Sequence, residues 1–548
     1  MSAQDNLGSL PRTAKTRRQP QFRQIYPILM VILGLATYLR YSGLDTPGLW
    51  LDEVSYTIAA QRPIFDQIIK PTETLGDYLS VDPTLSDIPF SLSLLLGSAN
   101  FFVRLPAAIF GILSVALIYR TGRELLGIWP GLIAAFLLCL SSFHILYSQE
   151  GRSYSQFIFF STASFLFLYK AVTVKELKYW GLYALATWAA VSTNHLMIFA
   201  VAVQGLFLLL FLAMAVRSQN FRLVMFLTNM GYFCLAVLAV ALFRLPWLED
   251  FTQRQCAGCD IGRPSYSLDI LGGFINAIKA FSAESRLVLF VLGSTALIGM
   301  VSLCLKNRNA EGLLTIWFFL SIIISTIGLW FISQFYHPRY TIWGLPAYLL
   351  LAAYGIVVIA NRPVFIKNRP ALTALGGCLA LIFSLVNFFQ IQQNVQIKQR
   401  WPLGMLQETT NVIIAGADTG ETVIVIGLPR QHLKFYIEQE RQDLTFIDER
   451  TFAEEYLISP LPDRLAGRWY VLHNASASPN IPTEWPGHQD YYTFYDLLVV
   501  HNATPCRLKE CVTQTKALLL EIAEANPDSS LAKRVNNVID SFNVLQLQ

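Results

Sequence analysis

Two adjacent carboxylates, Asp52 and Glu53, end the short sequence Leu49-Trp50-Leu51-Asp52-Glu53, directly after the first long apolar run of the chain. A carboxylate that is partly withdrawn from water can accept a proton from an attacking hydroxyl group. This position next to an apolar segment favours an acid/base site at the edge of a membrane domain.

Three further turns between apolar segments are rich in side chains that can do chemistry. Guanidinium groups bind phosphate oxygens in pairs and keep their charge, so Arg152 and Arg339, with His337, are candidate phosphate ligands. The other polar or aromatic side chains of these turns are His144, Tyr147, Gln149, Glu150, Tyr154, Asn194, His195, Tyr336 and Tyr340. Ionisable groups at membrane depth are costly and therefore functional candidates, although any one of them could be a solvated anchor in the membrane interface. A base and a phosphate clamp together indicate a lipid-phosphate donor.

The composition places these turns in a polytopic membrane protein. Of the 548 residues, 54% are hydrophobic and only 14% are charged. A membrane span needs roughly 20 mostly apolar residues. Eleven segments qualify, at about 25–43, 104–121, 127–147, 152–172, 177–194, 196–216, 224–247, 286–305, 311–332, 338–360 and 370–391. The net charge of +4 gives no indication of a nucleic-acid partner.

Basic residues predict the orientation, because Lys and Arg that flank a span are retained in the cytoplasm. The basic tail 1–24 is therefore expected inside, and every second turn after it is also basic. This register requires that the short apolar piece 88–101 lies on the outer surface without crossing. The region after residue 391 is then outside, on a protein of the plasma or inner membrane. The first apolar run is long for a signal peptide and no small-residue cleavage site follows it, so no cleavage is expected.

Four cysteines fall outside the predicted spans, as the close pairs Cys256 with Cys259 and Cys506 with Cys511. Such pairs suit disulfides in an oxidising compartment. A metal site or redox chemistry is the alternative for a Cys-x-x-Cys spacing. The other four cysteines lie within spans, where a thiol is usually a small apolar residue.

Beyond the tail, the chain divides into a membrane domain, 25–391, and a polar region, 392–548. The membrane domain includes two large outer loops, 44–103 and 248–285. The polar region reads as a small α/β domain. Its strand-like runs are Glu421–Gly427, Leu444–Asp448, Arg468–His473 and Tyr492–Val500, and its helix-like runs include 509–525 and 530–543.

Several motifs, in this order, resemble the C-type (GT-C) membrane glycosyltransferases, in the branch of the protein O-mannosyltransferases and the lipid A aminoarabinose transferases (glycosyltransferase family 39-like). The resemblance covers the whole membrane domain. The matching pieces are Leu49 to Glu53, Arg104-Leu105-Pro106-Ala107-Ala108, Tyr119 to Arg123, Ser148 to Tyr154, Thr193-Asn194-His195, Leu245-Pro246-Trp247, His337-Pro338-Arg339-Tyr340 and Leu345-Pro346-Ala347.

The resemblance implies an inverting transfer of a sugar from a polyprenyl-phosphate donor to a hydroxyl on the outer side of the membrane. Asp52 would be the general base, and Glu53 would orient it or the acceptor. Arg152 and Arg339, with His337, would stabilise the leaving phosphate. The remaining substrate contacts would be Glu150, Tyr154, His195 and Tyr340.

One family segment differs in this chain. Family members usually carry a His-Pro-Pro-Leu-Tyr-like segment before the Arg-Leu-Pro motif. At this place the chain has Asp82-Pro83-Thr84-Leu85-Ser86-Asp87-Ile88-Pro89-Phe90, followed by a shorter stretch. Asp82 or Asp87 could replace that contact, or neither. No cofactor is expected. A divalent metal is possible but not predicted, because adjacent carboxylates on a helix diverge by roughly 100° and chelate poorly.

Two other classes of function stay open. A transporter or flippase of a lipid-linked sugar would also need apolar helices with a few charges, but it should place these charges near the bilayer midplane. In this chain the polar groups crowd one edge of the spans. A polysaccharide polymerase or ligase would need the same phosphate clamp, and the acceptor could be a lipid, a protein or a polysaccharide.

Overall fold

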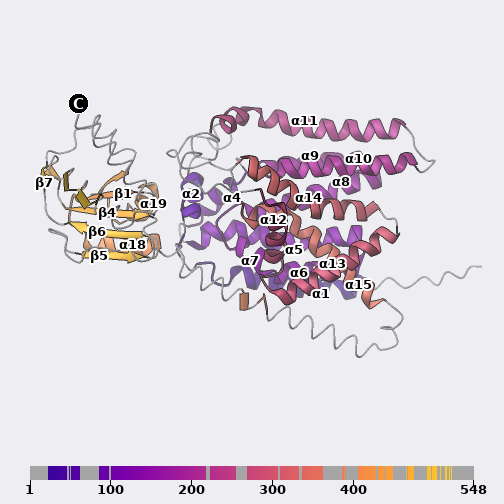
Figure 1. Ribbon diagram of the computed structural model, residues 1–548, viewed down its shortest axis with the longest axis horizontal. Coiled ribbons are helices and arrows are strands. Elements are labelled where there is room, and N and C mark those ends of the chain that lie inside the picture. Colours follow the sequence, from indigo (N-terminus) through magenta and orange to yellow (C-terminus); the bar gives the residue numbers. More distant parts are fainter. Residues whose placement is uncertain are drawn as a thin grey trace, which may run out of the picture.

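A helical bundle and a small mixed sheet make up the computed structural model of this chain (Figure 1). The residues that it describes are 22–45, 48–49, 51–61, 64, 85–97, 100–217, 223–254, 268–306, 309–332, 336–361, 386–387, 389–390, 405–426, 430–438, 440–448, 464–465, 467–473, 490–494, 497–502, 506–507, 513–514, 517–518 and 520.

The long helices of the bundle form because apolar runs of this length satisfy all their backbone hydrogen bonds internally. Their bounds are α1 Phe22–Tyr41, α5 Asn100–Leu125, α6 Ile128–Leu140, α8 Tyr154–Val174, α9 Leu177–Val191, α10 Met197–Arg217, α11 Leu223–Arg254, α13 Arg286–Lys306, α14 Asn309–Ile332 and α15 Leu345–Ala360. The shorter helices are α2 Leu51–Ala60, α4 Ile88–Leu94, α7 Ser142–Ser148, α12 Ile270–Phe281 and the 3₁₀ helix η1 Pro338–Gly344.

Helices cover ten of the eleven predicted spans, and most of the eleventh, 370–391, lies outside the described residues. Within the described part of the chain, five helices are long and apolar enough to cross a membrane, and the bent pair α6 and α7 would make a sixth. The structure therefore supports an integral membrane protein without fixing the number of spans. The piece 88–101 holds the seven-residue helix α4, which is too short to cross.

A bend of 63° separates α6 from α7, within the predicted span 127–147. Ser141 has an extended backbone at the bend, and its hydroxyl accepts a hydrogen bond from the His144 N–H. The buried Arg40 donates to the carbonyl oxygens of Leu138 and Cys139, at distances of 3.1 and 3.3 Å. The arginine thus bonds carbonyl oxygens at the end of α6, where the regular i to i+4 hydrogen bonds of the helix stop.

The C-terminal region forms a five-stranded mixed sheet in the order β2-β1-β4-β6-β5. Its strands are β1 Thr422–Ile426, β2 Thr445–Asp448, β4 Arg468–His473, β5 Asp490–Phe494 and β6 Leu497–Asn502. β1 is parallel to β2 and β4, whereas β6 is antiparallel to β4 and β5. Helices α18 Met405–Gly416 and α19 Arg430–Ile437 accompany the sheet, and β3 Arg464–Leu465 pairs with β7 Cys506–Arg507.

The α/β architecture predicted for this region is confirmed, with one local error. The single strand predicted over Tyr492–Val500 is the hairpin of β5 and β6, which pair antiparallel. Within the predicted range nearly all residues favour strands, and the single Asp496 was not enough to indicate a turn between two strands. Of the predicted helix 509–525, only residues 513–514, 517–518 and 520 are described, and 530–543 lies outside the described residues.

The disulfides stay a prediction. Cys256, Cys259 and Cys511 lie outside the described residues, and of Cys506 only the backbone, in β7, is described. The described thiols of Cys139, Cys234 and Cys304 are free.

Helices α13 and α15 approach closely at two glycines. A Cβ on Gly355 would overlap the carbonyl oxygen of Thr295, and a Cβ on Gly299 would overlap that of Leu351. Small residues allow such close helix packing in membrane proteins.

We expect Gly355→Ala to lower the free energy of unfolding by about 1–3 kcal/mol, because the added methyl group must push the two backbones apart. The measurement is thermal unfolding of the purified protein in detergent. Gly181→Ala in α9 is the matched control, because no atom lies within 4 Å of a Cβ at that position. Equal stability of both variants would contradict this account of the contact.

Candidate active site

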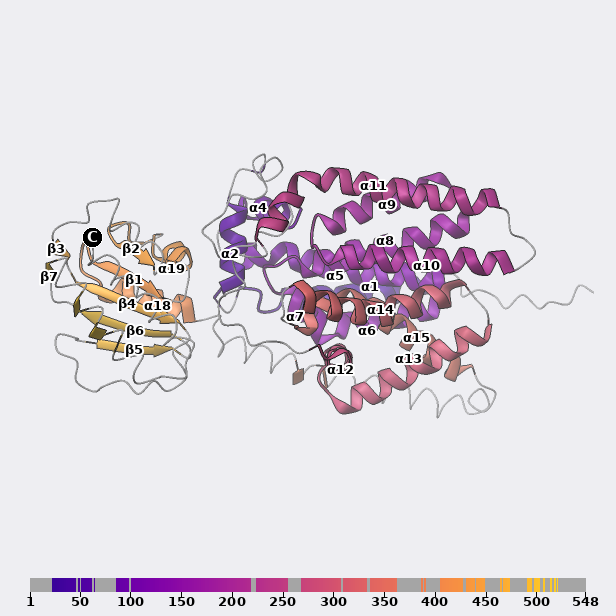
Figure 2. The same ribbon diagram turned by 45° about the horizontal axis from the view of Figure 1, so that its top comes forward.

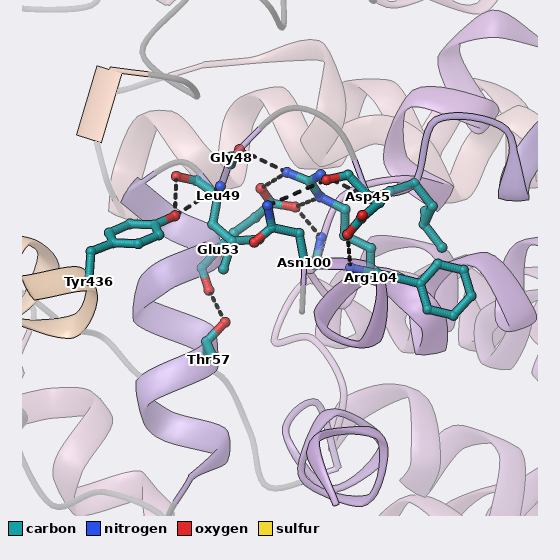
Figure 3. A network of polar contacts seen from close by, with 11 residues as sticks. Asp45, Gly48, Leu49, Glu53, Thr57, Asn100, Arg104 and Tyr436 are labelled. Atoms are coloured by element: carbon teal, nitrogen blue, oxygen red, sulfur yellow. Dashed lines mark hydrogen bonds and ion pairs between the residues drawn. The ribbon is translucent and has the colours of Figure 1, made fainter. Parts of the chain in front are cut away.

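Glu53 is buried in the first turn of α2 and its carboxylate is fully engaged. Arg104 of α5 donates through Nε to Oε1 and through Nη2 to Oε2, each at 2.8 Å (Figure 3). The Gly151 N–H also donates to Oε1, at 2.6 Å. One carboxylate therefore joins α2, α5 and the turn between α7 and α8.

Arg104 also holds the segment that precedes α2. Its Nη1 donates to the Leu44 carbonyl oxygen at 3.1 Å, and its Nη2 donates to that of Gly48 at 3.0 Å. At Gly151, a Cβ would lie 2.8 Å from a methyl carbon of Val103, so a side chain there would disturb the bond to Glu53. Arg104 opens the Arg104-Leu105-Pro106-Ala107-Ala108 motif, but its role was not predicted from the sequence. The sequence feature that could have indicated a role for Arg104 is that it is a charged residue within an apolar segment.

Asp52 has a different environment from its neighbour. Its side chain is 37% exposed, and Oδ2 forms an ion pair with Nη1 of Arg152 at 2.7 Å. Successive helical side chains point roughly 100° apart, so Glu53 faces the protein interior while Asp52 faces an open side. Asp52 is thus the more accessible of the two carboxylates.

Two arginines meet around Tyr154. The Arg152 guanidinium lies 4.9 Å from the Tyr154 ring centroid and 5.7 Å from that of Tyr56. The Arg339 guanidinium lies 6.0 Å from the Tyr154 centroid and 5.2 Å from that of Tyr340, whose hydroxyl is 3.3 Å from Nη2. Cation–π contacts of this kind hold guanidinium groups against aromatic faces. The structure thus brings Asp52, Arg152, Tyr154, Arg339 and Tyr340 together.

His337 precedes η1 and accepts a hydrogen bond through Nδ1 from the Arg339 N–H, at 3.2 Å. Burial, with the nearby charges of Arg339 and Arg152, lowers the pKa of His337 to about 4. The ring is therefore neutral at physiological pH, and its proton is on Nε2 because Nδ1 accepts. His337 can then offer a phosphate an N–H group but no positive charge.

Four of the other residues singled out in the sequence lie close to α8 or in the turn between α9 and α10. Glu150 is half-buried in the turn before α8, close enough to Arg104 for an electrostatic interaction, and Tyr147 packs against Tyr154 with ring centroids 5.1 Å apart. His195 is half-buried and Asn194 is buried, both in the turn between α9 and α10.

The remaining three candidates, His144, Gln149 and Tyr336, contact a buried arginine or backbone carbonyl oxygens of neighbouring segments. The buried His144 ring lies 2.7 Å through Nδ1 from Nη2 of Arg40, and Gln149 donates to the carbonyl oxygens of Leu39 and Ser42. Tyr336 donates through its hydroxyl to the Gly273 carbonyl oxygen of α12 at 2.7 Å.

At the segment that differs from the family pattern, Asp82 lies outside the described residues. Asp87 is buried, and its Oδ1 accepts from the Ser86 hydroxyl at 2.7 Å. Among the described residues, no three His, Cys, Asp or Glu side chains are grouped to hold a metal ion.

Residues 88–247 match the family described as dolichyl-phosphate-mannose-protein mannosyltransferase. This range includes Arg104, Glu150, Arg152, Tyr154 and His195. No curated protein sequence matches the chain.

Among solved structures, ArnT from Cupriavidus metallidurans in the apo state is 12% identical, with a TM-score of 0.55 over 87% of this chain and 98% of that one. The same protein bound to undecaprenyl phosphate gives 11% identity and a TM-score of 0.56, over 86% and 98%. The oligosaccharyltransferase AglB from Archaeoglobus fulgidus, in complex with an inhibitory peptide and a dolichol-phosphate, gives 11% and 0.51, over 83% and 70%. The chain has the fold of the GT-C glycosyltransferases.

This fold and the family match confirm the resemblance drawn from the ordered motifs. The match over 88–247 also supports the predicted enzyme class, a glycosyltransferase. A shared fold does not assign roles to single residues, so proposals about these roles must rest on the contacts described above.

We expect Glu53→Gln to destabilise the fold by about 3 kcal/mol, because it leaves the Arg104 charge buried without a counter-charge. Asp52→Asn should cost less than about 1 kcal/mol, because that ion pair is partly exposed. Thermal unfolding of both variants in detergent makes the comparison. A Glu53→Gln protein as stable as wild type would contradict a structural role for the buried pair.

The lowered pKa of His337 predicts a pH-dependent stability. An unfolded histidine binds a proton near pH 6.5, whereas the folded ring does so only near pH 4. Stability is therefore lost as the pH falls from about 6.5 towards 4. Between pH 7 and pH 5, wild type should lose about 2 kcal/mol more stability than His337→Asn, as followed by thermal unfolding. Identical pH dependence in the two proteins would show that His337 is not responsible.

Proposed function

We propose that this protein is an inverting glycosyltransferase that moves a sugar from a polyprenyl-phosphate donor to a hydroxyl acceptor at the outer face of the membrane. The observation that carries this proposal is the open carboxylate of Asp52 beside the paired guanidinium groups of Arg152 and Arg339. When a sugar leaves a phosphate, the acceptor hydroxyl loses a proton and the phosphate gains negative charge. A base next to two guanidinium groups can stabilise both changes.

The chemical step is a single displacement at the anomeric carbon. Asp52 takes the proton of the acceptor hydroxyl as the hydroxyl oxygen forms its bond to that carbon. The bond between the carbon and the phosphate oxygen breaks, and its electron pair leaves with the phosphate. Attack from the face opposite the leaving group inverts the configuration of the sugar.

Arg152 and Arg339 stabilise the phosphate on which negative charge accumulates. Both guanidinium groups are already positioned by aromatic rings, so little reorganisation is needed as the charge develops. The neutral His337 adds an Nε2–H donor. Arg152 also holds Asp52 at 2.7 Å, which ties the position of the base to that of the leaving group.

Glu53 serves this site indirectly. Its oxygens accept from Arg104 and Gly151, so it orients the first turn of α2 and does not accept the substrate proton. Tyr154 and Tyr340 shape the donor site through their contacts with the arginines. Glu150 and His195 keep their proposed role as sugar or acceptor contacts.

The polyprenyl-phosphate donor is supported by the solved structures of the same fold, which were determined with undecaprenyl phosphate and with a dolichol-phosphate. The outer-face assignment follows from the basic residues of alternate turns. It places the N-terminus in the cytoplasm and the C-terminal domain outside, where a lipid, protein or polysaccharide acceptor would be met.

Asp52→Asn should abolish sugar transfer, with a fall in rate of at least about a hundredfold, because the amide cannot take the proton. The measurement is transfer of radiolabelled sugar from a panel of polyprenyl-phosphate sugars in membranes that contain each protein. Asp269→Asn is the control. Asp269 caps α12 by accepting from the Gly272 N–H, and an asparagine caps equally well.

Transfer from one donor that is lost in Asp52→Asn and kept in Asp269→Asn supports the proposal. If the label crosses the bilayer without transfer, equally in all three proteins, the transferase proposal is wrong and a flippase is favoured. Repeated addition to a growing chain by wild type would identify a polymerase.

A further inference from the structure

Tyr436 of α19 makes two hydrogen bonds to the backbone of Leu49, three residues before Asp52. The Leu49 N–H donates to the Tyr436 hydroxyl at 3.0 Å, and the same hydroxyl donates to the Leu49 carbonyl oxygen at 3.2 Å (Figure 3). These residues are 387 positions apart in the chain and belong to the C-terminal domain and the membrane domain. Burial raises the pKa of Tyr436, so its hydroxyl keeps the proton that it donates.

Apolar side chains make the contact wider than one tyrosine. Leu49, Val54 and Val103 of the membrane domain are buried in one cluster with the core of the C-terminal domain. That core includes Leu406, Ile413, Val423, Leu433, Ile437, Trp469 and Val471. In two views, α19 and α18 lie at the end of the bundle that carries α2 (Figures 1 and 2).

The segment before α2 is thus held from two sides. Arg104 holds it from the side of the bundle, by donating hydrogen bonds to the carbonyl oxygens of Leu44 and Gly48. Tyr436 holds the next residue, Leu49, from the C-terminal domain. Asp52 follows in the first turn of α2. The direction of its side chain therefore depends on the backbone conformation of the segment that precedes this helix.

We propose that the C-terminal domain is part of the active-site framework, and that Tyr436 is a positioning residue that fixes the start of α2 and thereby the base Asp52. This inference rests on the proposed function for the role of Asp52. The contact itself does not depend on it. A tyrosine that bonds both groups of one residue restrains the direction of the backbone more than apolar packing alone does.

The test compares Tyr436→Phe with Tyr470→Phe. Phenylalanine keeps the packing of Tyr436 and removes both hydrogen bonds. Tyr470 is buried in β4, but alternation along the strand places it on the opposite face of the sheet from Trp469 and Val471, which belong to the shared cluster. Tyr470→Phe therefore measures a general weakening of the domain.

The first readout is hydrogen–deuterium exchange of the full-length protein in detergent, which needs no substrate. Amides in the peptide from Leu49 to Ala60 should exchange about tenfold faster in Tyr436→Phe and at the wild-type rate in Tyr470→Phe. Val54→Ala, on the other side of the same contact, should also accelerate them. Unchanged exchange in Tyr436→Phe, or equal acceleration in both tyrosine variants, would overturn the proposal.

The second readout is the kinetics of sugar transfer. Tyr436→Phe should lower kcat about fivefold to tenfold and leave KM for the lipid donor within about twofold, because the phosphate clamp is untouched. A raised KM with an unchanged kcat would overturn the positioning role. If wild type transfers no sugar from any donor, the proposed function fails, and the exchange result still decides whether the domain fixes α2.

Discussion

The buried ion pair of Glu53 and Arg104 is the interaction on which the site depends. Two charges taken out of water are tolerated only when every remaining donor and acceptor is satisfied. Here the carboxylate recruits the Gly151 N–H, and the guanidinium recruits the carbonyl oxygens of Leu44 and Gly48. Satisfying one pair therefore fixes α2, α5 and the turn before α8 relative to each other. Asp52 and Arg152, the proposed base and the first arginine of the proposed phosphate clamp, lie next to residues of that network.

Adjacent carboxylates can differ in role because a helix turns each side chain away from its neighbour. Glu53 is directed into the protein, where it forms structure, and Asp52 is directed to an exposed side, where it can meet a substrate. The arginines likewise divide into a buried, structural pair and a pair at the candidate active site. Arg104 and Arg40 are buried and bond to backbone carbonyl oxygens, whereas Arg152 and Arg339 lie around the Tyr154 ring.

The pair of cations at Tyr154 is the physical basis for the proposed binding of a phosphate. Arg152 and Arg339 are close enough to repel each other electrostatically, and aromatic faces offset part of this repulsion. An anion with several oxygen atoms can bond both guanidinium groups and relieve the rest. The neutral His337 adds a donor without adding a third positive charge, which is why its low pKa matters to the site.

The sequence by itself determined the membrane class, the positions of most long helices and four of the strand regions, and it singled out Asp52, Arg152 and Arg339 as candidate reactive residues. These properties follow from local composition, from the period of apolar residues and from the expense of charge at membrane depth. Only the tertiary structure decided which partner each residue has. Glu53 with Arg104, His144 with Arg40 and Leu49 with Tyr436 are 51, 104 and 387 positions apart. Nothing local marks such pairs, because they form only when distant helices pack and bury their polar groups together.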